Sequence, residues 1–289
     1  MRTKLKLPVY FGALVLALTA SVVSCSKDST APQSSARVAQ QKSQDSQEIS
    51  RRAGKYHTDA LVYVFAKLSQ ANKNSTKGEK CRIAMAALKE FDKSFRKDAR
   101  STAFVGDGVC GTPGATGDIP QFGELSVPSL AGTGFSPLAA SMLTEIGNVT
   151  NTHASSSSVV SAVTGVQNSA GAKLSPAEAS AVAAAGSVAI SSAEYWEANA
   201  EKWRGLSSTP GVLRKQISTT GADGTKSAAP LTRPRASLSS DCCGGIAAAD
   251  ITTFISSLMQ GWFMGVFDVE QASYRATVAS IIAGLRLIF

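Results

Sequence analysis

The chain has 289 residues, of which 44% are hydrophobic and 17% are charged, so it is long enough for one large domain or two small ones with a real core. Its 29 lysines and arginines against 21 aspartates and glutamates give a mild net charge of +8, which does not by itself indicate a polyanion-binding protein. Three of the basic residues fall within the first six positions, and without them the balance is +5.

The first 24 residues predict an export signal. A positively charged start is followed by an uncharged run that is too short to span a bilayer comfortably, and then by small residues. The sequence Val22-Val23-Ser24-Cys25 resembles the lipobox of bacterial lipoproteins, in which signal peptidase II cuts before a cysteine whose sulfur carries a diacylglycerol. The resemblance implies that Cys25 is the lipidated N-terminus of the mature protein. The alternatives are an ordinary cleaved signal, with Cys25 incidental, and an uncleaved anchor.

The same resemblance implies where the mature protein resides. Two acyl chains, at about 0.8 kcal/mol per buried CH₂, hold a protein persistently on a membrane. The residues Ser26-Lys27-Asp28 place no aspartate directly after Cys25, which is similar to lipoproteins of the outer membrane and to lipoprotein starts in Bacteroidota. We therefore expect an outer-membrane lipid anchor on a periplasmic or surface-facing protein. The lipid bilayer is the expected partner through the acylated N-terminus, and nucleic acid is not expected.

Four further cysteines, Cys81, Cys110, Cys242 and Cys243, form an even set in a compartment that permits disulfides. A bridge between the adjacent Cys242 and Cys243 would need strained geometry, so we expect one of them to reach Cys81 and the other Cys110. Such bridges would clamp the N-terminal part of the chain onto the C-terminal part. A metal site is not expected, because no histidine or acid lies at ligand spacing from these cysteines.

The mature chain divides into four parts by composition. Residues 25–52 are polar and predict a disordered tether. Residues 53–104 carry apolar residues at spacings of three and four, interrupted at 72–78, and predict an amphipathic helical hairpin. Residues 105–135 hold eight glycines and three prolines and predict a long loop. Residues 136–289 predict a helical domain.

The hairpin carries most of the excess positive charge. Ten basic residues lie between Lys67 and Arg100, against four acids. We interpret this stretch as a solvated helix face, and binding to an anionic surface or to an envelope protein is the alternative.

Two long helices with small residues along one side are predicted in the helical domain. The first begins at Ser175-Pro176, with Glu178 completing a capping box, and should run to Arg204 before Gly205. Its expected buried seam alternates steps of four and three residues: Val182, Gly186, Ala189, Ala193, Trp196, Ala200 and Trp203.

The second long helix is expected to begin at Asp250, as its N-cap, and to continue straight or gently bent to about Ala283. The 17 residues from Ile251 to Phe267 carry no charge and include a GxxxG pattern of the kind that packs transmembrane helices. Their polar residues fall on the side opposite the large apolar ones, which favours a core helix of a soluble bundle. Membrane insertion is the alternative.

No catalytic, cofactor-binding or metal-binding residue is predicted. The two histidines, His57 and His153, have no spacing that would pair them on a metal. Ser94 to Lys97 matches SxxK without the companion motifs of a penicillin-recognising enzyme. Gly106 to Gly111 spells GxGxxG, but no βαβ pattern surrounds it.

The sequence therefore predicts an all-α protein, a helical bundle with long Gly/Pro-rich connecting loops. The expected function is that of a membrane-tethered extracytoplasmic lipoprotein with a structural or interaction role. The alternative is a membrane-active, pore-forming or bacteriocin-like helical protein. Residues 54–61 and 191–196 resemble fragments of uncharacterised exported helical proteins of Bacteroidota, a resemblance that supplies no activity. Within these fragments His57, Tyr195 and Trp196 are the first positions to mutate.

Overall fold

The computed structural model describes residues 30–96, 110, 129–130, 132–152, 155–207, 237–265 and 268–288. These residues form seven α-helices and no strand, which confirms the predicted all-α fold. The helices are α2 (Thr30–Gln70), α3 (Lys77–Phe95), α4 (Pro137–Thr152), α5 (Ser156–Lys173), α6 (Pro176–Arg204), α7 (Ser237–Phe263) and α8 (Val269–Ile288). Within the described ranges, none of them has the length and apolar character needed to cross a membrane.

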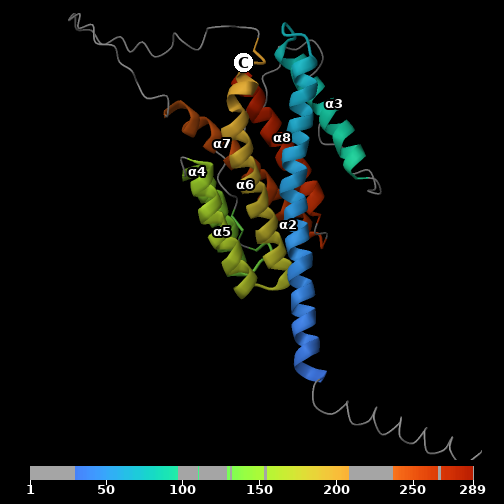
Figure 1. Cartoon of the computed structure of the whole chain (residues 1–289), viewed down its shortest axis with the longest axis vertical. Coiled ribbons are helices and arrows are strands. Elements are labelled where there is room, and N and C mark those ends of the chain that lie inside the picture. The colour runs from blue at the N-terminus through green and yellow to red at the C-terminus, as the bar shows by residue number, and fades with distance from the viewer. Residues whose placement is uncertain are drawn as a thin grey trace, which may run out of the picture. The chain divides into compact units, whose positions relative to one another are not determined.

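The chain separates into two units, Met1–Asp45 and Ser46–Phe289. The described part of the first unit is the beginning of α2. The second unit is the helical bundle, in which α6 lies between the α4–α5 pair and the α2–α3 pair (Figure 1). The hydroxyl of Ser50 donates to the carbonyl of Ala183, and the ring of Phe65 contacts that of Trp203. The bundle part of α2 therefore runs parallel to α6.

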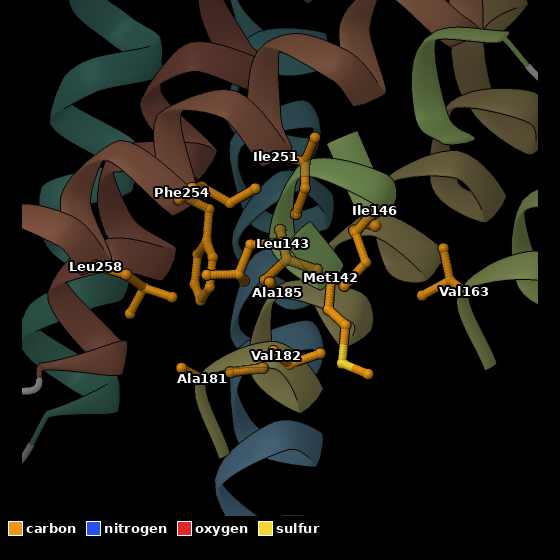
Figure 2. Packing of buried hydrophobic residues seen from close by; sticks show 14 of the residues in the cluster. Met142, Leu143, Ile146, Val163, Ala181, Val182, Ala185, Ile251, Phe254 and Leu258 are labelled. Atoms are coloured by element: carbon orange, nitrogen blue, oxygen red, sulfur yellow. The ribbon is translucent and has the colours of Figure 1, made fainter. Parts of the chain in front are cut away.

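One core of the bundle is built from aliphatic and small side chains of α4, α5, α6 and α7. Figure 2 shows Leu143 and Ile146 of α4 facing Val182 and Ala185 of α6, with Phe254 of α7 beside them. We call this the aliphatic core. Its small residues let neighbouring helices approach closely, and each fully buried Leu, Ile or Phe side chain contributes about 1.5–3 kcal/mol.

A second core is rich in aromatic side chains and joins α2, α3, the C-terminal half of α6 and α8. Tyr56 of α2 meets Phe91 and Phe95 of α3 edge-on, with ring centroids 5.5 and 4.9 Å apart. Trp196 and Trp203 of α6 contact each other and are fully buried. We call this the aromatic core.

The helix predicted from Ser175 has the expected limits. Ser175 accepts a hydrogen bond from the backbone N–H of Glu178, Pro176 occupies the first turn, and Gly205 follows the last residue. The Glu178 carboxylate accepts from the hydroxyl of Ser175 and from the backbone N–H of Ser136, so it also fixes the start of α4. All seven residues of the predicted seam are buried.

The predicted disordered tether at 25–52 is wrong for residues 30–52, which are helical and belong to α2. Ile49 already packs against the aliphatic core, and Ser50 is hydrogen-bonded to α6. The polar composition of this segment does not prevent a helix, because only the turns directly before Ala53 pack against the bundle.

The prediction of one long helix after Asp250 is also wrong, because α7 and α8 form a hairpin. Gly265 has a φ of 70°, a left-handed conformation that suits glycine and ends α7. Asp268 then accepts from the backbone N–H of Gln271 at 2.8 Å and caps α8. Asp250 is not an N-cap, since α7 begins at Ser237 and Asp250 lies inside it.

One helix was not predicted. This helix is α5, and it begins in the run of serines at 155–158. The side chain of Ser155 accepts from the backbone N–H of Ser158 and caps the helix. Its buried residues are Val159, Val163, Val166 and Ala170, a spacing of four, three and four. The sequence contained this periodicity, but its serines and glycines have low helix propensity and obscured it.

The disulfide is also different from the expected pairing. Cys81 and Cys110 are bonded to each other, with their Cα atoms 5.6 Å apart. Neither is therefore available to Cys242 or Cys243, whose side chains lie outside the described residues. The two bonded cysteines are 29 positions apart in the sequence, so the bridge closes a short loop and does not clamp the two halves of the chain together. Most of the predicted Gly/Pro-rich loop at 105–135 also lies outside the described residues.

Candidate functional site: a buried histidine and aspartate cluster

His57 of α2 and Asp250 of α7 face each other inside the bundle. His57 Nε2 lies 3.3 Å from Asp250 Oδ2, and the side chains of both residues are 0% exposed. Burying a charge is unfavourable unless it is paired and hydrogen-bonded, so their surroundings decide what this pair does.

Two serines complete the environment of the carboxylate. Ser192 of α6 and Ser280 of α8 both donate to Asp250 Oδ2, the second at 2.7 Å. Trp196 Nε1 of α6 donates to the hydroxyl of Ser280 at 2.8 Å. The cluster therefore links four helices, α2, α6, α7 and α8, through one carboxylate oxygen. The other oxygen, Asp250 Oδ1, has no hydrogen-bond partner among the described residues.

The His57 ring lies between a hydroxyl and the carboxylate. Thr277 Oγ1 donates to the carbonyl of Ser273 at 2.8 Å and lies 3.2 Å from His57 Nδ1. On the other side of the ring, Nε2 is close to Asp250 Oδ2 but makes no hydrogen bond of good geometry with the described residues.

Two glycines set the positions of the groups in this cluster. A Cβ at Gly54 would lie 2.4 Å from the Ser187 hydroxyl oxygen, so α2 approaches α6 at this level only without a side chain. A Cβ at Gly284 would lie 2.3 Å from the Trp196 ring. Gly54 precedes His57 by about one turn and Gly284 follows Ser280 by one turn. Each glycine thus brings a cluster residue within reach of α6.

Burial raises the pKa of Asp250, while the contact with His57 and the hydroxyls of Ser192 and Ser280 act in the opposite direction. Burial outweighs these contacts, so the partners offset the cost of burying the carboxylate only in part. Removing one partner from such a buried pair leaves an uncompensated charge, which typically costs about 3–5 kcal/mol.

The geometry of the cluster differs from that of a nucleophilic triad. In a triad a serine hydroxyl donates to the histidine, which the aspartate orients from its other side. Here Ser192 and Ser280 donate to Asp250 itself, and His57 bonds to Thr277 instead of a serine. Neither serine is activated by this arrangement. Its direct physical effect is to fix how α2, α7 and α8 lie against α6.

Three residues singled out from the sequence fall in or near this cluster. His57 contacts Asp250 at its centre, and Trp196 donates to its Ser280 hydroxyl. Tyr195 points elsewhere: its hydroxyl accepts from Trp203 Nε1 at 2.9 Å, and burial raises its pKa to about 12. His153 and the lipidation candidate Cys25 lie outside the described residues.

Asp250, Ser192, Ser280 and Thr277 were not predicted as members of a site. One signal was present for Asp250, a lone acid between two apolar runs whose residues are buried on both sides. The serines and threonine gave none, because on helices with a small-residue seam they are indistinguishable from close-packing positions.

The basic stretch is only partly a solvated face. Lys80 is buried, its ammonium donates to the carbonyls of Lys73 and Leu206 at 3.1 and 2.8 Å, and burial lowers its pKa. Arg96 is also largely buried and pairs with Asp92 at 2.8 Å. Lys80 thus joins α3 to the segment after α6, whereas the Arg96 ion pair lies at the end of α3 itself.

Among the described residues, no group of three or more histidine, cysteine, aspartate or glutamate side chains is placed to hold a metal ion. Comparison with protein-family models, with curated proteins and with solved structures found no match to this chain.

Proposed function

We propose that this protein is a lipid-anchored extracytoplasmic protein with a structural or interaction role. The observation that carries the proposal is the N-terminal sequence, a basic start and an apolar run ending in Val22-Val23-Ser24-Cys25. Its mature part would then be held by the acylated Cys25 at the outer membrane, on the periplasmic or the surface side.

The disulfide supports an oxidising location. Cys81 and Cys110 are both buried in the aromatic core, where a bridge links α3 to the segment that follows it. Disulfides of this structural kind persist in extracytoplasmic compartments and are rare in the reducing cytosol.

The buried cluster supports a structural role. Its polar groups bond to one another across four helices, and the His57 and Asp250 side chains are withdrawn from solvent. Polar groups used in this way stabilise the packing of the bundle, which suits a structural or interaction role.

Metabolic labelling with an alkyne analogue of palmitate tests the attachment directly. The wild-type protein should take up the label and be recovered with membranes, and its N-terminal peptide should begin at a triacylated or diacylated Cys25. Cys25→Ser should abolish the label and leave the precursor uncut. Cys242→Ser, a matched loss of one thiol from the folded body, should keep it. Unlabelled wild-type protein with its leader intact would overturn the proposal.

A further inference from the structure

The turn between α7 and α8 displays two large apolar side chains side by side. Phe263 is 80% exposed and Met264 is 69% exposed. Directly before them, Trp262 stacks on Phe135 with ring centroids 4.3 Å apart, and Phe135 precedes the first turn of α4. Leu138 in that turn is also exposed. We call Leu138, Phe263 and Met264 the apolar tip.

The apolar tip lies at the end of the bundle where α2 enters it. Arg52 of α2 is paired with Glu270 in the first turn of α8, two residues after the cap of that helix. Of the four large apolar side chains that are exposed in the described residues, three belong to the tip and the fourth, Val62, lies further along α2. Exposed apolar groups are therefore concentrated at one end.

Both arginines of α2 at this end are paired with acids. Arg51 is paired with Glu48 at 3.0 Å, and Arg52 is paired with Glu270. Neither arginine is therefore left to bind an anionic partner. The exposed apolar groups instead suit an apolar environment, and Trp, Phe and Leu are side chains that insert at the boundary between lipid headgroups and acyl chains.

We propose that the apolar tip rests in the surface of the bilayer that carries the Cys25 lipid. The inference rests on the proposed lipid anchor. Twenty residues lie between Cys25 and Ser46, where the second unit begins, and even at the short rise of 1.5 Å per residue a chain of this length reaches about 32 Å. The end that α2 enters is thus the end held within reach of the bilayer, and tethering raises the local concentration of membrane around it. The opposite end is further away by the length of α6, about 43 Å.

Tryptophan fluorescence offers a direct test, because the three tryptophans are distributed unequally. Trp196 and Trp203 are fully buried in the aromatic core, whereas Trp262 is at the tip. The mature lipidated protein would be reconstituted into phosphatidylcholine vesicles with and without lipids brominated near the headgroup. We expect bromine to quench part of the emission of the wild-type protein and none of the emission of Trp262→Phe.

Two matched variants separate insertion from simple proximity. Phe263→Ser with Met264→Ser should lose most of the quenching, while Val62→Ser, which also removes one exposed apolar side chain, should keep it. All variants carry the Cys25 lipid and float with the vesicles.

The outcomes distinguish the two proposals. Protein that carries no lipid and does not float overturns the proposed function. Floating, lipidated protein without Trp262 quenching overturns the tip inference alone. Quenching that is lost equally in Val62→Ser also overturns it. Protection of the tip by a second copy of the chain, seen as a cross-linked dimer through residue 263, would replace the membrane by a protein partner.

Discussion

The two cores of the bundle are stabilised in different ways. The aliphatic core contains apolar side chains and small residues, and its stability comes from the apolar area that it buries. The aromatic core adds directional contacts: a disulfide, edge-on rings, and a tyrosine hydroxyl that donates to Asp92 at 2.6 Å. The His57 and Asp250 cluster lies where α6 passes from one core to the other. The aliphatic core therefore stabilises the bundle mainly by burying apolar area, and the directional contacts of the aromatic core also fix the relative positions of its helices.

The largest effect should come from Asp250→Ala, which removes the shared partner of His57, Ser192 and Ser280 between the cores. We expect the free energy of unfolding in urea to fall by about 3–5 kcal/mol. Asp268→Ala, which removes only the cap of α8, is the matched control and should cost about 1 kcal/mol. Equal losses in the two variants would mean that the cluster does not join the cores.

Removal of the disulfide tests the contribution of the aromatic core to stability. Cys81→Ser with Cys110→Ser should lower the free energy of unfolding by about 2–4 kcal/mol, mainly because the unfolded chain is no longer closed into a loop. Reduction of the wild-type protein should reproduce this loss, and peptide mapping should recover Cys81 linked to Cys110. A mapped bridge from either cysteine to Cys242 would refute the pairing.

Two glycines test close packing against α6. Gly284→Ala places a methyl group against the Trp196 ring and should destabilise the protein by about 1–3 kcal/mol. Gly171 of α5 has nothing within 4 Å of its added Cβ, so Gly171→Ala should stabilise it by about 0.4–1 kcal/mol. Opposite signs in thermal unfolding are the expected result, and the same sign in both would argue against the close approach of α8 to α6.

The smallest expected effect is a pH dependence of stability that comes from Glu178, on the aliphatic side of the bundle. Burial raises the pKa of Glu178, but the hydrogen bonds from Ser136 and Ser175 outweigh it and hold that pKa below its ordinary value. The stability that this carboxylate contributes is therefore complete above the unfolded pKa of about 4.3 and is lost as the pH falls through the folded one. The Tm of the wild type should exceed that of Glu178→Gln at pH 6, and the difference should vanish near pH 3. A difference that is unchanged between these pH values would contradict the assignment.

Helix limits could be predicted where local chemistry fixes them. Ser175, Pro176 and Gly205 specify α6 without help from the rest of the molecule, and the structure has those limits. The hairpin of α7 and α8 could not be predicted from spacing, because apolar and small residues recur at steps of three and four on both sides of Gly265. The decisive features there were a left-handed glycine and a capping aspartate, both local and both weak in a sequence.

The cluster was out of reach for a different reason. Its members come from four helices and are adjacent only after these helices have packed, so no spacing along the chain reveals them. His57 could be selected as a position of interest, yet its partner Asp250 looked like a helix cap because it stands before an apolar run. Long-range polar contacts of this kind follow from tertiary structure alone.

A double-mutant cycle across His57→Ala and Asp250→Ala tests most directly whether this buried pair holds the two cores in register. The four proteins would be unfolded in urea under identical conditions, and the interaction free energy would be taken from the non-additivity of their stabilities. We predict a coupling of up to about 3 kcal/mol, with the double variant more stable than the sum of the single losses implies. Losses that add within about 0.3–0.5 kcal/mol would contradict the account.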